Sequence, residues 1–349
     1  MNLSLRKLSP TESCDDFLIA HEAPLTQSLM YATWHMTLGR TLHRYVVEMA
    51  ESAATPQQSV KQIAYIQAIE VPLFLGKKYL YAPYGPVIDT RYIHLTLPFI
   101  KKEFTNIAKG IGASFFRLDI SPTISDATPL LQKTFFKASK KTYKGSFFQS
   151  RAEWALDVRP SADQLLANIH SKTRYCIRTA EKRNCVVNII SDNLQAHFAT
   201  FAALMKETAT RNGFNLHDEA YYKAIFANLN ENKRGFLVTT TVSSIITNCM
   251  LFVKFGSTVM YIFGGSTTDQ YNVPAAHLAL WRAIQHTKSL GATTFNFGGI
   301  STDEYPNPSL ANLTQFKTRF GGYNLRHSSF YDLVIDRLTY VLFFLRKLF

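Results

Sequence analysis

The feature that most constrains the fold of this chain is an order of helices and strands that occurs twice along it. In the first half the sequence predicts a short helix, a turn at Gly39 and a strand over 25–49, strands at 59–70 and 78–89, a helix at 96–109 and a strand at 114–120. In the second half it predicts helices at 163–183, 194–212 and 221–230, strands at 235–241, 245–255 and 258–264, a helix from Pro274 to Gly291, and a strand at 293–297. Helices precede an antiparallel meander and a final helix–strand pair each time, which indicates an α+β layout repeated in two domains.

The helix at 96–109 illustrates these assignments. Its apolar residues recur at spacings of three and four, at Leu97, Ile100, Phe104 and Ile107. Gly110 and Gly112 follow, and they nearly match the pyrophosphate loop of acyl-CoA acetyltransferases. That loop needs free N–H groups at a helix N-terminus, whereas these glycines come after a helix, whose C-terminus presents carbonyl groups. We therefore interpret them as a helix cap.

Composition narrows the class of protein. The chain of 349 residues can form two domains, and 46% hydrophobic against 18% charged residues is typical of a folded protein. A net charge of +13 favours polyanionic partners such as nucleic acid, nucleotide-linked substrates or an anionic membrane surface. The first residues lack the apolar core of a secretory signal, and no apolar run is long enough to cross a bilayer. We expect a cytoplasmic protein.

The usual signatures of metal and nucleophile chemistry are missing. The four cysteines are too scattered for a zinc site, and they fit free thiols in a reducing compartment: Cys14, Cys176, Cys185 and Cys249. The ten histidines lack the spacing of metal ligands. The sequence has no HExxH, GxSxG or GxxxxGK[ST] motif. We predict no metal and no cofactor.

Eight short blocks, which are weak singly, occur in one order along the chain. The upstream blocks are TQSLMY (26–31), YGPVID (84–89), KTRYCIRTAEK (172–182) and ETATRNGF (207–214); the downstream ones are Tyr261–Gly264, Asn272–Ala275, Phe295–Gly298 and Phe316–Gly322. In this order they resemble the Fem family of peptidoglycan-bridge aminoacyltransferases, over nearly the whole chain.

The resemblance implies tandem acetyltransferase-like domains, with the C-terminal helix packing back on the first domain. It divides the chain into residues 1–157 with 328–349, and residues 158–327. It also implies transfer of an amino acid from aminoacyl-tRNA to the stem peptide of a muramyl-pentapeptide precursor, whether nucleotide-linked or lipid-linked. The tRNA ester is already activated, so positioning and oxyanion stabilisation suffice, without a triad or metal.

The family motif places Lys317 at the developing oxyanion, with Phe316 beside it. Without the resemblance, Lys317 would be interpreted as a solvated loop lysine. Two departures from the family bear on this site. The family aspartate of the Tyr-Asp-Phe strand is Asn296 here, and the stretch between Tyr222 and Gly235 has no room for the helical arm of some members. A short, arm-less member is therefore expected.

Five further residues are candidates for substrate binding. Arg211 resembles part of the precursor-binding region and fits a diphosphate contact, or else a salt bridge to Glu207. Tyr84 and Tyr261 fit residues that flank the precursor, although tyrosines at strand ends also form core rims. Arg174 and Arg178 lie one helical turn apart, which fits a phosphate-contacting face or an ordinary solvated one.

Two alternative functions remain open. One is N-acyl transfer from an acyl-CoA donor to a small amine, against which the missing pyrophosphate loop argues. The other is a non-catalytic relative that binds cell-wall precursors, which Asn296 favours and the intact Phe316-Lys317 pair opposes.

The C-terminal tail is unusually apolar. Its predicted inward face carries Leu333, Leu338, Val341, Phe344 and Leu345. This face leaves other apolar residues outside it, close to basic ones: Tyr340, Leu342, Phe343 and Phe349 beside Arg337, Arg346 and Lys347. Such a helix fits peripheral contact with an anionic membrane, or simply buried structure.

Overall fold

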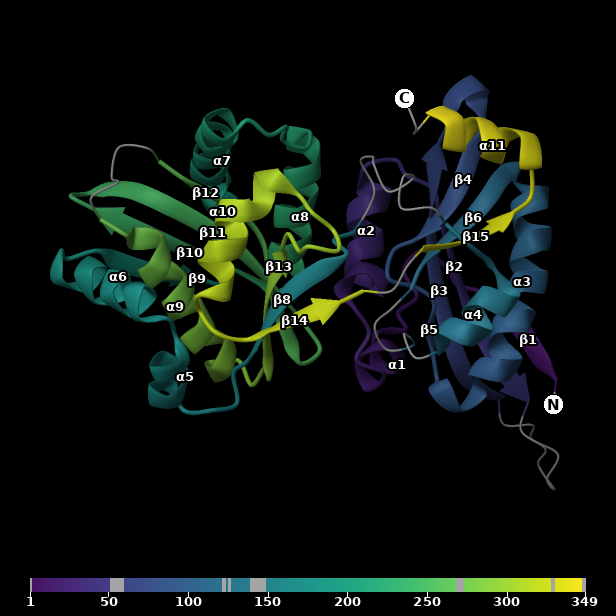
Figure 1. Cartoon of the computed structure of the whole chain (residues 1–349), viewed down its shortest axis with the longest axis horizontal. Helices are drawn as coiled ribbons and strands as arrows, with labels where there is room; N and C mark the ends of the chain where they lie inside the picture. The colour runs from purple at the N-terminus through teal and green to yellow at the C-terminus, as the bar shows by residue number, and fades with distance from the viewer. Residues whose placement is uncertain are drawn as a thin grey trace. The chain divides into compact units, whose positions relative to one another are not determined.

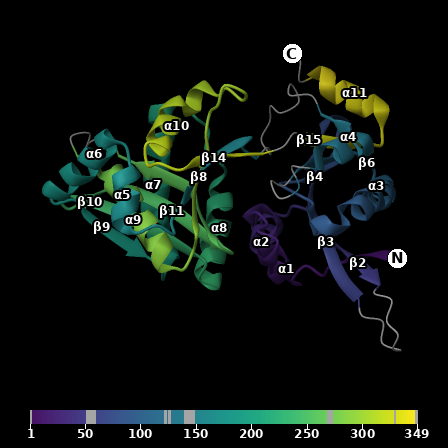
Figure 2. The same ribbon diagram turned by 60° about the horizontal axis from the view of Figure 1, so that its bottom comes forward.

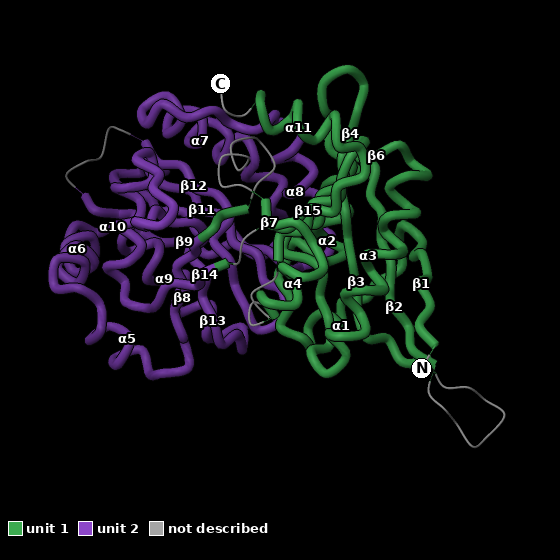
Figure 3. Tube along the Cα trace, turned by 45° about the vertical axis from the view of Figure 1, so that its right-hand side comes forward, with its two compact units in different colours: residues 1–151, 327–349 green, residues 152–326 purple. Residues whose placement is uncertain are grey.

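The computed structural model describes residues 2–50, 60–120, 124, 127–138, 149–267, 273–327 and 330–346. The chain forms two compact units, which are coloured separately in Figure 3. Unit 1 comprises Met1–Arg151 with His327–Phe349, and unit 2 comprises Ala152–Arg326. Each unit is built on one β-sheet that is accompanied by helices (Figure 1).

The sheet of unit 1 has the strand order β1-β2-β3-β4-β6-β15-β7, and β5 pairs with β3. Its strands are β1 (Leu3–Lys7), β2 (Leu42–Ala50), β3 (Val60–Pro72), β4 (Lys78–Ala82), β5 (Val87–Ile88), β6 (Ala113–Asp119), β7 (Phe136–Lys137) and β15 (Phe330–Val334). Its helices are α1 (Asp15–Ala20), α2 (Leu29–Thr37), α3 (Ile93–Gly110), α4 (Thr128–Thr134) and α11 (Arg337–Arg346). The strands β4 and β6 run parallel because α3 connects them as a crossover.

The apolar face predicted for α3 is confirmed. Leu97, Ile100 and Phe104 are fully buried in the core of unit 1. At the end of α3, the N–H of Ile111 donates to the carbonyl of Ile107 at 3.0 Å, and that of Gly112 donates to Lys109 at 3.1 Å. These amides are satisfied within the cap, so they are not available to a pyrophosphate group.

The sheet of unit 2 has the order β14-β8-β13-β12-β11-β10-β9. Its strands are β8 (Ala152–Asp157), β9 (Val186–Ile190), β10 (Gly235–Val242), β11 (Ile245–Phe255), β12 (Thr258–Ser266), β13 (Thr294–Gly299) and β14 (Tyr323–Arg326). Its helices are α5 (Ala162–Asn168), α6 (Ser171–Lys182), α7 (Phe198–Asn212), α8 (Glu219–Asn232), α9 (Ala275–Ser289) and α10 (Ala311–Thr318).

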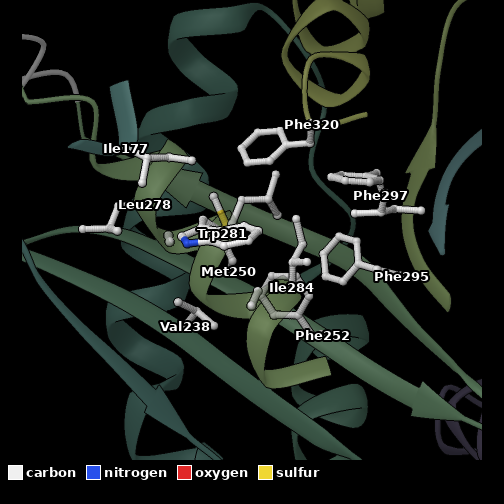
Figure 4. Packing of buried hydrophobic residues seen from close by; sticks show 14 of the residues in the cluster. Ile177, Val238, Met250, Phe252, Leu278, Trp281, Ile284, Phe295, Phe297 and Phe320 are labelled. Carbon is white, nitrogen blue, oxygen red and sulfur yellow. The ribbon is translucent and has the colours of Figure 1, made fainter. Parts of the chain in front are cut away.

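The core of unit 2 lies between α9 and the sheet. Trp281 and Ile284 of α9 are buried against Phe252 of β11 and Phe295 of β13, as Figure 4 shows. These two residues lie on the buried face of α9. The helix α9 packs against β10 and β11 (Figure 2). Asn272, which precedes this helix in the family block, lies outside the described residues.

The parallel pair β12 and β13 separates part-way along its length. Its register covers only Thr258–Met260 opposite Thr294–Asn296. On its other side β13 pairs with β8 from Thr294 onward, and that register is interrupted between Asn296 and Gly299. Gly298 adopts a φ of +75°, which favours glycine over residues with a side chain. At this divergence the carbonyl group of Gly299 on β13 accepts a hydrogen bond from a side chain of α10.

The first strand of unit 2 was assigned to the other domain by the sequence-based boundary at residue 157. In the structure, residues 152–157 form β8, which pairs with β13 on one side and β14 on the other. These hydrogen bonds are formed with distant parts of the chain, so no local signal marks them. The strand therefore belongs to the sheet of unit 2.

The single helix predicted over 163–183 is wrong, because the structure contains two helices. Ile169 and His170 adopt extended conformations between α5 and α6. The side chain of His170 accepts a hydrogen bond from the N–H of Lys172, which caps the start of α6. Arg174 and Arg178 thus both lie on α6.

The C-terminal segment returns to unit 1, as the fold prediction requires. The strand β15 pairs with β6, and the buried Arg117 and Asp332 form an ion pair at 2.7 Å between these strands. Of the predicted inward face of the tail, Leu333 on β15 is buried, but the part on α11 is wrong. Phe343 packs on Phe115 with ring centres 5.2 Å apart, while Leu338, Val341 and Leu345 are exposed. The aromatic side chains reach the core, so they determine which face turns inward.

Lys347 and Phe349 of the tail lie outside the described residues. Within the part that is described, none of the helices combines the length and the apolar character needed to span a bilayer.

Candidate functional site

Lys317 lies on α10 with its side chain at the divergence of β12 and β13. Only 4% of the residue is exposed, and its Nζ donates a hydrogen bond to the carbonyl oxygen of Gly299 at 2.7 Å. Burial lowers the pKa of the Lys317 ammonium to about 8, although the Glu153 carboxylate acts in the opposite direction. The group is a buried cation that loses its proton more readily than an ordinary lysine.

A carboxylate accompanies Lys317, but it comes from β8 rather than β13. Asn296 donates from Nδ2 to Oε2 of Glu153 at 2.8 Å, and its Oδ1 accepts from the N–H of Gly298 at 2.7 Å. Glu153 is buried and lies opposite Gly299 in the β8–β13 register. The sequence reasoning missed Glu153. The sequence signal that could have indicated it is Asn296. An amide at the position of the family aspartate implies that a carboxylate at this site must come from another strand.

The other predicted catalytic residue, Phe316, belongs to an aromatic wall. Its ring meets His277 edge-on at 5.0 Å and Phe320 at 5.5 Å. Burial lowers the pKa of the His277 imidazole to about 4, so this ring is neutral at neutral pH. The wall is therefore uncharged at neutral pH, and it contributes no second cation to unit 2's core.

Tyr261 lies on β12 at the same divergence. Its ring packs on Phe252 at 5.3 Å, and burial raises the pKa of its phenol. A Cβ placed on Gly298 would lie 3.3 Å from the carbonyl oxygen of Tyr261 and 3.8 Å from Nζ of Lys317. Gly298 thus lies between the two predicted residues and leaves the space between them open.

Arg211 lies on α7 and binds the end of β12. Its guanidinium donates to the carbonyl and the hydroxyl oxygen of Ser266, both at 2.9 Å. The rival salt bridge to Glu207 is not among the ion pairs of the described residues, and Glu207 instead accepts from Thr267 at 3.0 Å. Arg211 therefore ties α7 to the sheet, with its charge only partly buried.

The two arginines of α6 differ. Arg174 donates to the carbonyl of Ala167 at 2.9 Å and also to that of Ile169, so it stabilises the end of α5. Arg178 is exposed. Of the pair, Arg178 is the one whose guanidinium projects into solvent, where a polyanion can meet it.

Tyr84 lies in unit 1 and is buried. Its hydroxyl donates to the carbonyl of Ser150 at 2.5 Å, and its ring stacks on His327 at 4.1 Å. These contacts are those of a core residue.

The structure therefore brings two of the predicted residues together, namely Lys317 and Tyr261, and adds Glu153 and Asn296 to them. Phe316 precedes Lys317 on α10, but its ring contacts His277 and Phe320. Arg211, Arg174 and Arg178 lie elsewhere on unit 2. Among the described residues, no group of three or more His, Cys, Asp or Glu side chains could hold a metal ion.

Comparison with known proteins decides the family. The model of the FemAB family matches residues 136–248 and 238–347, which together make up more than half of the chain. The chain belongs to the FemAB family. Among curated proteins, a lipid II:glycine glycyltransferase of Staphylococcus aureus (strain USA300) is 22% identical, with 68% of this chain and 72% of the relative covered.

Solved structures extend the FemAB assignment to the fold. The crystal structure of FemX superposes with a TM-score of 0.80 at 19% identity, covering 97% of this chain and 99% of that one. A tandem GNAT protein from the clavulanic acid biosynthesis pathway superposes with a TM-score of 0.52 at 8% identity, covering 95% and 98%. The predicted family and the predicted tandem acetyltransferase-like fold are confirmed.

Proposed function

We propose that this FemAB member transfers an aminoacyl group from aminoacyl-tRNA to an amine on the stem peptide of a peptidoglycan precursor. The observation that carries the proposal is the buried Lys317 cation at the divergence of β12 and β13. The Staphylococcus relative, whose name states that it acts on lipid II with glycine, supports the acceptor class. The aminoacyl-tRNA donor rests on the family resemblance and on the basic charge of the chain.

The reaction needs little from the protein beyond placement and charge. The amine nitrogen forms a bond to the ester carbonyl carbon, the bond from that carbon to the ribose oxygen breaks, and the amine proton leaves with that oxygen. Negative charge develops on the carbonyl oxygen in between. Lys317 Nζ uses one donor for Gly299, and its remaining donors stabilise this oxyanion. A buried cation is more effective here than a solvated one, because water screens it less.

Glu153 is the positioning residue of this site. Its carboxylate acts against the burial that lowers the Lys317 pKa, so it favours the charged form of the lysine. Asn296 keeps the carboxylate in place and also bonds to the backbone at Gly298. In this chain the Asn296 amide therefore orients the Glu153 side chain, and the negative charge comes from Glu153 on the neighbouring strand β8.

The proposal is tested by incubating the full chain with charged tRNA and a muramyl-pentapeptide precursor, and measuring the product mass. We expect one added aminoacyl residue that depends on both substrates. Thermal unfolding with coenzyme A provides the contrast. A clear rise in Tm with coenzyme A, without any tRNA-dependent product, would instead establish an acyl-CoA donor.

Donor binding is expected to be strongly salt-dependent, because a tRNA contacts the protein through several phosphates. The logarithm of the binding constant should fall as the logarithm of the salt concentration rises, with a slope of about −2 or steeper. Arg178→Glu should flatten it, whereas Lys109→Glu on the exposed surface of unit 1 serves as the matched control. Filter binding at several salt concentrations measures the slope, and a value near zero would favour a small acyl donor.

We also place the reaction at an anionic membrane surface when the acceptor is lipid-linked. The net charge of +13 supports this contact.

A further inference from the structure

The helix α11 has two apolar faces, and only one of them is covered. Phe343 is buried, and Tyr340 donates from its hydroxyl to Asp332 at 2.7 Å. The opposite face carries four aliphatic side chains at spacings of three and four, each between 39% and 71% exposed: Leu338, Val341, Leu342 and Leu345. A helix that needs only to pack on unit 1 would carry polar residues there.

A groove continues this exposed face of α11. It has a volume of about 530 Å³ and is lined by apolar side chains that include Phe136, Leu333, Val334 and Val341. Phe136 is 61% exposed, which is unusual for a phenylalanine, and its ring meets Tyr340 edge-on at 6.2 Å. Helix and groove together form one apolar surface, which we call the α11 surface.

Positive charge surrounds the α11 surface. Lys101 and Arg337 line the groove and are both exposed. Arg346 is also exposed, and its guanidinium lies 4.9 Å from the ring centre of Phe74. The arrangement combines aliphatic side chains with a basic rim, which is the pattern of helices that lie in the plane of a membrane.

Two acidic residues approach the same region, and each has a basic partner. Asp332 lines the groove but is buried, where it is paired with Arg117. Asp336 lies 3.3 Å from Lys77 and accepts a hydrogen bond from Thr339 at the start of α11. The net charge that the α11 surface presents is therefore positive.

We propose that the α11 surface docks unit 1 onto an anionic lipid bilayer, with an acyl chain in the groove and lipid phosphates against Lys101 and Arg337. Charge favours this occupant over a second copy of the chain, because two basic rims repel each other. The helix is too short to span the bilayer and lies on it instead. Docking would place the enzyme where a lipid-linked acceptor resides, and this consequence rests on the proposed function. The docking itself does not depend on that function.

The test is sedimentation of the full chain with vesicles of phosphatidylcholine alone and with vesicles that also contain phosphatidylglycerol. We expect binding to the anionic vesicles only, weakened by added salt. Arg337→Gln and Lys101→Gln should each weaken it about fivefold, as expected for loss of one charge near the surface. Leu338→Ser with Leu342→Ser should weaken it further at every salt concentration.

Matched controls keep the result specific. Leu95→Ser removes an exposed leucine from α3, and Lys7→Glu changes an exposed lysine on β1. Both should bind as the wild type does, and all variants should retain the wild-type Tm. Transfer to a water-soluble acceptor should be unchanged in the α11 variants, so failure of docking and failure of the proposed function are distinguishable.

Two results would overturn the inference. One is the absence of binding to anionic vesicles. The other is a concentration-dependent dimer, seen by light scattering, that Leu338→Ser with Leu342→Ser abolishes while vesicle binding is unaffected. The second result would assign the α11 surface to another copy of the chain.

Discussion

Replacing Lys317 by alanine is expected to lower kcat by about 10²–10³-fold, which is the range for removal of one oxyanion donor. The apparent affinity for the precursor should change little, because the interaction strengthens only as charge develops on the carbonyl oxygen. Steady-state kinetics with purified charged tRNA measures both quantities. Lys317→Met retains most of the side-chain length, so it tests the charge with less disturbance of the buried site than alanine.

A matched control for Lys317 exists in the same unit. Lys254 also donates from Nζ to a backbone carbonyl, that of Leu290, at 2.7 Å. Lys254→Met therefore removes a comparable hydrogen bond away from the β12–β13 divergence and should leave kcat unchanged. Wild-type turnover by folded Lys317→Met, or an equal loss in both variants, would contradict the oxyanion role.

Replacing Glu153 by glutamine is expected to move the alkaline limb of the activity profile to lower pH. The Lys317 ammonium, with its pKa of about 8, is charged below pH 8 and loses its charge as pH rises through this value. Without the Glu153 charge the Lys317 pKa falls further, so the cation disappears at lower pH. If the Lys317 pKa falls by one unit, the activity measured at a fixed pH on the alkaline limb falls about tenfold. Glutamine still accepts a hydrogen bond from Asn296, so the geometry is retained.

The measurement is the ratio of kcat/KM for Glu153→Gln to that of the wild type between pH 6 and pH 9. Taking the ratio cancels the titration of the substrate amine, which is common to both enzymes. The ratio should be highest at acidic pH and fall as pH rises.

A charge exchange between the two strands distinguishes electrostatics from simple structural support. Combining Glu153→Gln with Asn296→Asp returns the carboxylate to β13, and the alkaline limb should recover. Superimposable profiles for Glu153→Gln and the wild type would contradict the role given to Glu153. A loss that is equal at all pH values and not recovered by the exchange would show that Glu153 serves the fold alone.

The local elements of this chain follow from its sequence, since their causes are local. The apolar spacing of Leu97, Ile100 and Phe104 defines a buried face within one helix, and the structure confirms it. The ordered motif blocks likewise lead to the FemAB family without any coordinates. They also single out Lys317, although its role in transfer remains a proposal.

The tertiary structure alone decided which of these elements meet. Asn296 and Glu153 are 143 positions apart, and only the β8–β13 register brings the amide to the carboxylate. The same pairing makes β8 part of unit 2, although the sequence-based boundary had assigned it to the first domain. The inward face of α11 was decided by the space available to Phe343 beside Phe115, because both faces of that helix are apolar and its own periodicity cannot distinguish them. Sequence patterns record the preferences of neighbouring residues, whereas strand register and core shape depend on contacts between residues that the chain separates.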